Sequence, residues 1–403
     1  PDRADGSSSL VHRAFIFTGL LGLIPPLKLL PAWVALIAIA CWPWQPRRLI
    51  IAGSYSLLLA LDWGMLALLP IKQRSWGPVT PSLLGLTLVR TLLAWGLAWL
   101  PLHTLGLGLL ILLNILLSIT AIYATWVEPF NLGLTHQKIH PAAWAARRSL
   151  RLLHISDLHF EGLSPREKRL LEIARTLKPE LIVFTGDYLN LSSVHDPQIQ
   201  AQARKYLAQF QAPLGVYAVA GTPAVDIPEL IPQIFSGLSI RWLAEEAIAI
   251  PWAGDKIWLL GMRSTYNEAQ DIATLERLMR ENVPEGALSL LLYHTPDLMP
   301  HAARLGVTLY LAGHTHGGQL RLPLYGALAT SSRWGKRYEM GRYQENETTL
   351  YVSRGIGLEG LGAPRARFLA PPEVVLWELD SIAAANEAAI AYEAAGANEA
   401  AGA

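Results

Sequence analysis

The pattern of hydrophobic and polar positions divides the chain into three parts. Before about residue 130, long apolar runs contain few polar positions, as in membrane-spanning helices. Residues 150 to 380 show short apolar runs separated by amphipathic stretches, a pattern typical of a soluble domain of strands and helices. We therefore expect a transmembrane helical domain at residues 1–135 and an α/β domain at residues 150–380. Residues 381–403 are mostly Ala with Glu, Asn and Gly, and we expect a tail without an assigned function.

Four apolar segments predict about four transmembrane helices. The runs Leu49–Pro70, Leu83–Leu100 and Leu105–Trp126 each have about the length of one bilayer-spanning helix. Ala14–Trp44 is also apolar, but it is broken by Pro25, Pro26, Lys28 and Pro31, so it could form one kinked span or a re-entrant pair. We count it as one span. A cleaved signal peptide is not expected, because further apolar spans follow.

Composition and charge agree with a membrane protein. The chain is 52% hydrophobic and only 16% charged, which favours membrane segments. A formal net charge of +1 argues against a nucleic-acid partner recognised through bulk charge. Asp62 and Arg90 lie inside predicted spans, where a charge normally faces a partner or water. We favour a structural ion pair between helices over a transport role, because no further ionisable groups outline a pathway.

The distribution of basic residues predicts the orientation in the cell (plasma) membrane. With four spans, basic residues of the amino terminus, the second loop and the segment after the last span share one side: Arg3, Arg13, Lys72, Arg74, Lys138, Arg147 and Arg148. Loops rich in Lys and Arg stay on the cytoplasmic side. We therefore expect an integral membrane protein whose C-terminal domain is cytoplasmic.

The C-terminal domain alternates short apolar strands with helical patterns. The strands are predicted at Leu152–Ile155, Leu181–Phe184, Val216–Ala220, Leu288–Tyr293, Val307–Leu311, Leu320–Leu322, Thr349–Ser353 and Val374–Leu379. The helices are predicted at Pro165–Leu177, Pro197–Phe210, Ile272–Asn282 and Pro296–Leu305. Since the last strands lack intervening helices, we expect a sheet-rich, layered α/β fold.

Carboxylates and imidazoles follow the ends of several of these strands. The set comprises Asp157, His159, Asp187, His294, His314 and His316. Asp157 and His159 are two positions apart, so in extended backbone they share a face and can reach the same ion. His314 and His316 have the same spacing between glycines, which allow a close approach of the backbone. Oxygen and imidazole ligands at strand ends are typical of a site for divalent first-row metals.

The order and spacing of these motifs resemble the calcineurin-like metallophosphoesterases. Their signature is Asp-x-His, Gly-Asp-x-x-Asp/Asn, Gly-Asn-His-Asp/Glu, a lone His, and Gly-His-x-His. The matching residues are Asp157 and His159, Gly186, Asp187 and Asn190, His294, Gly313, His314 and His316. The extension Gly317–Pro323 and the later Tyr351–Gly355 are similar to the membrane-anchored bacterial branch of the family. The resemblance covers roughly residues 150 to 380.

The resemblance implies a four-layer fold of two sheets flanked by helices, with a two-metal centre. It assigns Asp157, His159, Asp187 and His316 to the first metal, and Asp187, His294 and His314 to the second. The implied cofactors are one or two divalent ions of Mn, Zn or Fe. It also assigns substrate contacts to Asn190 and Arg321.

One motif of the family is altered in this chain. After the strand Val216–Ala220, the chain reads Gly221-Thr222-Pro223-Ala224 instead of Gly-Asn-His-Asp/Glu. Thr222 offers only a hydroxyl where the family has a ligand, and Pro223 occupies the position of the family's catalytic acid without a titratable group. The catalytic residue is therefore unknown. The site could be impaired or specialised, it could belong to a pseudoenzyme, or Asp226 or His195 could replace the lost groups, although both are more simply loop residues.

These observations favour a membrane-anchored, metal-dependent phosphoesterase, whose activity the altered motif could impair. Its expected partners are the bilayer and a phosphorylated small molecule or lipid, and no nucleic acid. The alternative is a catalytically inactive subunit of a larger membrane complex, docked to other membrane-protein subunits through its spans.

Overall fold

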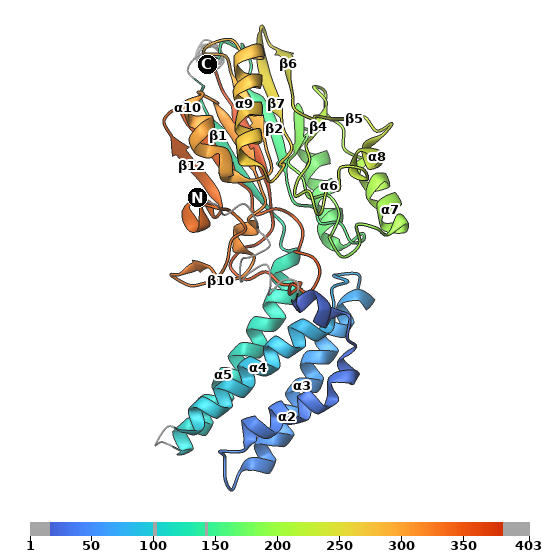
Figure 1. Cartoon of the computed structure of the whole chain (residues 1–403), viewed down its shortest axis with the longest axis vertical. Helices are drawn as coiled ribbons and strands as arrows, with labels where there is room; N and C mark the ends of the chain where they lie inside the picture. The colour runs from blue at the N-terminus through green and yellow to red at the C-terminus, as the bar shows by residue number, and fades with distance from the viewer. Residues whose placement is uncertain (1–16, 100–102, 142–143, 382–403) are drawn as a thin grey trace, which may run out of the picture. The chain divides into compact units, whose positions relative to one another are not determined.

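A computed structural model describes residues 17–99, 103–141 and 144–381 of the chain. The predicted Ala-rich tail lies outside the described residues, apart from Ser381. The described chain forms two compact units (Figure 1). The first contains the residues up to Pro129 together with Leu358–Arg367, and the second contains Phe130–Gly357 together with the residues from Phe368 onward.

The first unit consists mainly of apolar helices. They are η2 (Pro26–Leu29), α2 (Leu30–Cys41), α3 (Arg48–Ile71), α4 (Val79–Ala98), α5 (His103–Ile122), η3 (Tyr123–Val127) and η4 (Glu128–Phe130). Three helical segments of the described chain are long and apolar enough to cross a membrane: Arg48–Ile71, Val79–Ala98 and Leu105–Phe130. The predicted first span is represented by the shorter apolar helix Pro26–Cys41. The described chain therefore has three full-length candidates and one shorter helix where the sequence predicts about four spans.

A buried polar cluster joins three of these helices. Arg90 on α4 donates two hydrogen bonds to the Asp62 carboxylate on α3, from Nε to Oδ2 and from Nη2 to Oδ1, each 2.9 Å long. The same guanidinium donates to Asn114 Oδ1 at 2.9 Å and to Ser118 Oγ at 3.0 Å, both on α5. A charge pair in an apolar bundle is tolerated when its polar atoms are hydrogen-bonded in this way. This arrangement agrees with a structural role for the pair.

The second unit contains two six-stranded sheets and one small hairpin. The first sheet has the order β1-β14-β2-β3-β4-β5 and the second the order β12-β13-β9-β8-β7-β6, while β10 and β11 form the hairpin. The strands of the first sheet are β1 (Gly133–Ile139), β2 (Leu150–Ile155), β3 (Leu181–Phe184), β4 (Val216–Ala218), β5 (Ile240–Trp242) and β14 (Glu373–Leu379). The others are β6 (Glu246–Trp252), β7 (Asp255–Gly261), β8 (Ser289–Leu292), β9 (Leu309–Ala312), β10 (Arg321–Leu322), β11 (Gly326–Ala327), β12 (Gly341–Glu345) and β13 (Thr348–Val352).

Helices cover the outer face of each sheet, which gives four layers (Figure 1). These are α6 (Pro165–Leu177), α7 (Pro197–Leu207) and α8 (Ile231–Phe235) on the first sheet, and α9 (Glu268–Asn282) and α10 (Met299–Arg304) on the second. The short helices η5 (Pro296–Leu298), η6 (His316–Gly318) and η7 (Gly335–Tyr338) lie in loops.

Alternate residues of the central strands fill two different cores. Leu152 of β2 and Leu290 of β8 belong to the core between the two sheets. Their neighbours Leu153 and Leu291 pack under the outer helices. Because both faces are covered, the central strands are apolar at nearly every position, as expected for buried parallel strands. The mixed α/β architecture and its layers agree with the fold that the sequence predicts.

The parallel pairing of the central strands determines where their last residues lie. Strands β2, β3 and β4 run parallel in the first sheet, and β7, β8 and β9 run parallel in the second. The carboxyl ends of parallel strands meet at one edge of a sheet, where α/β folds place their sites. The motif residues follow β2, β3, β4, β8 and β9.

Candidate metal centre

The loops after the strands have an unusual backbone. Five of the six predicted ligands have positive φ angles: Asp157 52°, His159 40°, Asp187 57°, His314 71° and His316 52°. Residues other than glycine seldom adopt this left-handed conformation. Such backbone strain persists where the surrounding structure imposes it, and it is concentrated at functional sites.

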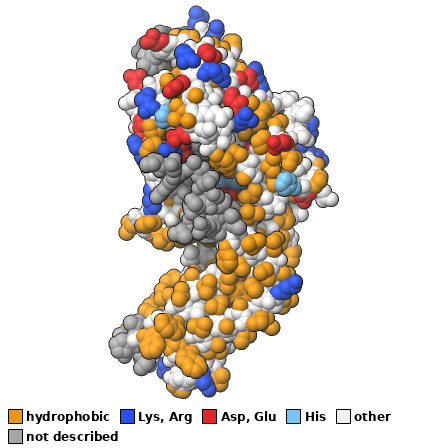
Figure 2. All heavy atoms as spheres, in the orientation of Figure 1, with side chains coloured by type: hydrophobic (Ala, Val, Ile, Leu, Met, Phe, Trp, Pro, Cys, Tyr) orange, Lys and Arg blue, Asp and Glu red, His pale blue; other side chains and the backbone are white. Residues whose placement is uncertain are grey.

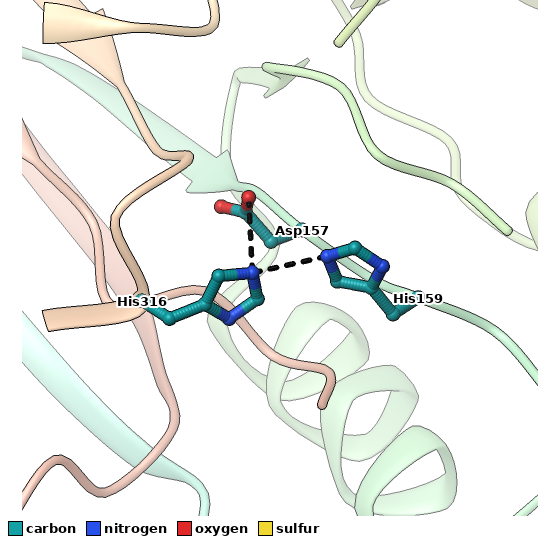
Figure 3. A group of neighbouring side chains, drawn as sticks. All are labelled: Asp157, His159 and His316. Atoms are coloured by element: carbon teal, nitrogen blue, oxygen red, sulfur yellow. Dashed lines mark hydrogen bonds and ion pairs between the residues drawn. The ribbon is translucent and has the colours of Figure 1, made fainter. Parts of the chain in front are cut away.

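Three of the predicted ligands form a first group. Asp157, His159 and His316 each offer a ligand atom, and these atoms lie within 4.8 Å of one another. His316 Nε2 is 3.0 Å from His159 Nε2 and 3.6 Å from Asp157 Oδ1, and the three side chains converge in Figure 3. All three are buried.

The other three predicted ligands form a second group. Asp187, His294 and His314 also bring ligand atoms within 4.8 Å of one another. His294 Nε2 is 3.3 Å from Asp187 Oδ2 and 3.1 Å from His314 Nδ1. Asp187 Oδ2 is also 3.5 Å from His159 Nε2 of the first group. Asp187 therefore lies between the two groups, where a carboxylate can face both.

The donor atoms of these groups fit divalent cations. Two imidazole nitrogens face each other at 3.0 Å in the His159–His316 contact, and among the described residues the buried Asp157 Oδ2 has no hydrogen-bond partner. Buried polar atoms normally have a partner, and a buried carboxylate is costly unless it is paired or binds a metal. A cation among these side chains would be coordinated by the facing imidazole nitrogens and would neutralise the charge of the buried Asp157 carboxylate, whose Oδ1 faces His316.

Backbone groups orient the imidazoles of the second group. His294 Nδ1 lies 2.7 Å from the carbonyl oxygen of Thr185, which leaves Nε2 facing Asp187. The carbonyl of Ser331 forms a backbone hydrogen bond with the His314 side chain. Metal-ligating histidines are commonly held by a hydrogen bond from their second ring nitrogen in this way.

Two glycines allow the ligand loops to approach one another. A Cβ atom on Gly313 would lie 2.1 Å from Asp157 Oδ2, and one on Gly221 would lie 2.2 Å from Asp187 Oδ1. Any larger residue at either position would collide with a predicted ligand. The glycines that flank the motifs therefore permit the convergence of the two sheets.

Thr222 from the altered motif takes part in the second group. Its Oγ1 lies 3.2 Å from Asp187 Oδ2, 3.2 Å from His294 Nε2 and 3.3 Å from His314 Nδ1. Its backbone N–H donates to Asp187 Oδ1 at 2.6 Å. The sequence suggested that this hydroxyl is a poor substitute for the family's ligand. The structure places it among the donor atoms, a position that depends on the loop and is not evident from the sequence.

Asp226 has a role that the sequence did not reveal. Its buried carboxylate accepts hydrogen bonds from the backbone N–H groups of Asp187 and Gly221, both at 2.7 Å, and of Tyr188 at 3.0 Å. It thereby holds the loops after β3 and β4 together. Through these three bonds Asp226 positions the loops that carry Asp187 and Gly221. His195, the other candidate replacement, is exposed.

The comparisons with known proteins agree with this geometry. The family model for calcineurin-like phosphoesterases matches residues 150–318. An uncharacterized metallophosphoesterase of Bacillus subtilis, YkuE, is 30% identical over 271 residues, covering 64% of this chain and 89% of the relative. The chain belongs to the calcineurin-like phosphoesterase family.

The names of two further similar proteins refer to a diacylated substrate or to a membrane. UDP-2,3-diacylglucosamine pyrophosphatase LpxG of Chlamydia trachomatis is 25% identical, with coverage of 64% of this chain and 92% of the relative. A transmembrane protein with metallophosphoesterase domain from Bos taurus is 28% identical, with coverage of 53% of this chain and 50% of the relative. Members of this family use divalent metals, and both groups of side chains suit such ions.

Burial and mutual charge shift the pKa values of the ligands. Burial would lower the pKa of His294, but the carboxylates of Asp187 and Asp157 raise it to about 10. Burial would raise the pKa of Asp187, yet His294 and His159 hold it below its ordinary value. Burial, assisted by the charge of His294, lowers the pKa of His314 to about 4. A cation bound at His294 would have to displace the proton that this raised pKa retains.

The two residues assigned to substrate contacts lie in loops of the second unit. Asn190 is fully buried, and its Oδ1 accepts hydrogen bonds from Ser192 N at 3.0 Å and Ser192 Oγ at 2.6 Å. Arg321 forms an ion pair with Glu339 at 2.8 Å and donates to the carbonyl of Gly317 at 2.7 Å.

Proposed function

We propose that this chain is a membrane-anchored phosphoesterase that binds two divalent ions and hydrolyses a lipid-linked phosphoester. The observation that supports it most is the convergence of two ligand groups on Asp187, with Thr222 in the second group. Three apolar helices precede this unit and supply an anchor. The relative named for a diacylated substrate supports the choice of a lipid.

We propose the following division of roles. Asp157, His159 and His316 would hold the first ion, His294 and His314 would hold the second, and Asp187 would contribute to both sites. When bound, ions such as Mn²⁺, Zn²⁺ or Fe²⁺ act as Lewis acids toward the phosphate and the attacking water.

The protein residues position and orient the reacting groups. Asn190 and Arg321 remain our proposed substrate contacts. The Thr222 hydroxyl completes the donor set of the second group, and Asp226 holds the loops that present Asp187. Positioning and charge neutralisation account for most of phosphoryl-transfer catalysis.

The altered motif restricts the leaving group. Pro223 has no proton to donate, so the departing oxygen must leave without a general acid at that position. A phosphate leaving group, as in a pyrophosphate bond, is a much weaker base than an alkoxide and needs no such acid. We therefore propose a lipid-linked pyrophosphate or another substrate with a weakly basic leaving group.

We also propose the setting of this reaction. The basic loops support an anchor in the plasma membrane with the second unit in the cytoplasm. A second candidate function, an inactive subunit of a larger membrane complex, is favoured by one observation, the loss of the acid at Pro223.

One experiment separates these functions. The purified full chain, loaded with Mn²⁺, is assayed on a diacylated sugar nucleotide, on bis(p-nitrophenyl) phosphate and on a phosphodiester with an alkoxide leaving group. We expect hydrolysis of the first two, and loss of both activities in Asp187→Asn. The variant Pro223→His should accelerate only the third reaction, by about 10²-fold or more. No turnover of any substrate by a chain with two bound ions would favour the inactive subunit.

A further inference from the structure

The β10–β11 hairpin of the second unit exposes an apolar tip. Leu322, Leu324, Tyr325 and Leu328 are all exposed, and Leu324 is as accessible as in an extended chain. The hairpin projects from the second unit in Figure 1. In Figure 2 the surface at its tip consists of hydrophobic side chains. Apolar groups gathered on one projection of a folded domain indicate an interaction surface.

The hairpin is held in this exposed conformation. At its base, Arg321 pairs with Glu339 and donates to the carbonyl of Gly317. Leu320 forms a bridge with Phe368. The Lys336 ammonium lies 3.2 Å from the centre of the Tyr325 ring. A two-stranded hairpin is marginally stable by itself, so these contacts maintain a preformed tip.

The side-chain types around the tip suit a membrane–water interface. From Gly317 to Tyr338 the sequence has no Asp or Glu. Its basic residues are Arg321, Arg333, Lys336 and Arg337. Carboxylates from outside this stretch pair with all four, Glu339 with Arg321 and Lys336, Glu268 with Arg333 and Glu345 with Arg337. The stretch also contains Tyr325 and Trp334, side-chain types that favour the membrane–water interface.

The length of the chain keeps this unit close to a bilayer. The last candidate span ends at Phe130, and β1 begins at Gly133. Three residues extend at most about 10 Å. A bilayer is therefore always within reach of the second unit, whereas a protein partner would have to be recruited.

We infer that the β10–β11 hairpin inserts Leu322, Leu324, Tyr325 and Leu328 into the interfacial region of the bilayer that anchors the chain. The hairpin begins five residues after the predicted ligand His316, so at most about 17 Å of chain separates an inserted hairpin from the metal centre. This inference goes beyond the proposed function, because membrane contact by the tip does not require turnover.

The test measures the surroundings of a probe at the tip. A fluorescent NBD label is attached to Leu324→Cys in a Cys41→Ser background, in the full chain reconstituted in nanodiscs of phosphatidylcholine and phosphatidylglycerol. A matched label at Glu285→Cys, an exposed loop position of the same unit, serves as the control. We expect blue-shifted emission at position 324 that brominated lipids quench, and unquenched emission at position 285.

The outcomes separate a bilayer from other occupants. An unquenched, unshifted probe at position 324 would overturn the inference. A blue shift without quenching by brominated lipid would place a protein surface over the tip and would also overturn it. Equal quenching at both positions would show unspecific immersion of the unit and would contradict insertion by the hairpin. Failure of the proposed phosphoesterase activity would leave this readout unchanged.

Discussion

The Thr222 hydroxyl lies within 3.3 Å of one carboxylate oxygen and two imidazole nitrogens. Valine has nearly the same shape as threonine but lacks this oxygen. We expect Thr222→Val to weaken binding of the second ion by about 10- to 100-fold, the usual effect of losing a supporting group. Thr222→Asn should bind at least as tightly as the native chain. Calorimetric titration with Mn²⁺ measures both. If Thr222→Val binds two Mn²⁺ ions with the affinities of the native chain, the hydroxyl does not contribute to binding of the second ion.

Proton release gives a second test at the level of single residues. The pKa of His294 is raised to about 10 by the neighbouring carboxylates, so His294 is protonated at pH 7 when no cation is bound. A cation needs the neutral imidazole, so binding must release this proton. The affinity should therefore rise by about tenfold per pH unit up to pH 10 for each proton released. A pH indicator in weakly buffered solution detects the release, and binding without acidification would contradict the account.

We expect a substitution of Asp226 to affect metal binding through the loops after β3 and β4, which its carboxylate holds together. Asp226→Asn replaces an acceptor by an amide group that cannot accept from all three backbone N–H groups. An unsatisfied buried donor costs about 1–3 kcal/mol. We expect faster amide exchange at Asp187 and Gly221 and weaker Mn²⁺ binding. Glu285→Gln, in an exposed loop, is the control. If amide exchange at Asp187 and Gly221 is unchanged in Asp226→Asn, the positioning role of Asp226 is wrong.

The six predicted ligands were accessible to sequence reasoning because each follows an apolar strand in a motif of fixed spacing. Thr222 and Asp226 were not, because their roles depend on the path of one loop. Thr222 lies where the family places a ligand, yet only the geometry shows that its oxygen reaches the same atoms.

Among the elements, helix α6 shows how local signals determine a helix. Ser164 and Glu167 form a capping box, with Ser164 Oγ accepting from Arg166 N at 3.2 Å and Ser164 N donating to Glu167 Oε2 at 2.9 Å. Removing an N-cap side chain costs about 1 kcal/mol. Ser164→Ala should therefore speed amide exchange in α6 about fivefold. Lys168→Ala, on the exposed face of the same helix, should change nothing, and equal effects of both substitutions would contradict the capping argument.

The same signals explain which elements could be predicted. The predicted helix Pro165–Leu177 has the observed bounds, whereas α9 begins at Glu268 instead of the predicted Ile272. Its N-cap Asn267 marks the true start but lies outside the apolar periodicity. Six strands were not predicted: β1, β5, β6, β7, β11 and β12. Strand β1, for example, lies at a sheet edge and is exposed or half-buried at all positions but the last, so it lacks a continuous apolar run. The central strands β2, β3, β8 and β9 were found because their apolar runs are continuous, whereas the central strand β7 begins with Asp255 and Lys256 and was missed.

On the scale of the whole molecule, the division near residue 130 followed from hydropathy, but the return of Leu358–Arg367 to the first unit did not. There, Arg367 N donates to the carbonyl of Ala124 at 2.8 Å. A Cβ atom on Gly362 would lie 2.0 Å from the Thr18 backbone. A short loop without apolar periodicity gives no sequence signal for such packing.

The metal content of the whole protein tests the central claim most directly. The purified full chain, equilibrated with Mn²⁺ and freed of excess ion, is analysed by inductively coupled plasma mass spectrometry beside Asp187→Asn and the control Glu285→Gln. Because Asp187 faces both ligand groups, we predict two ions per native or control chain and fewer than two in Asp187→Asn. A native chain without bound metal, or a count that Asp187→Asn leaves unchanged, would contradict the account.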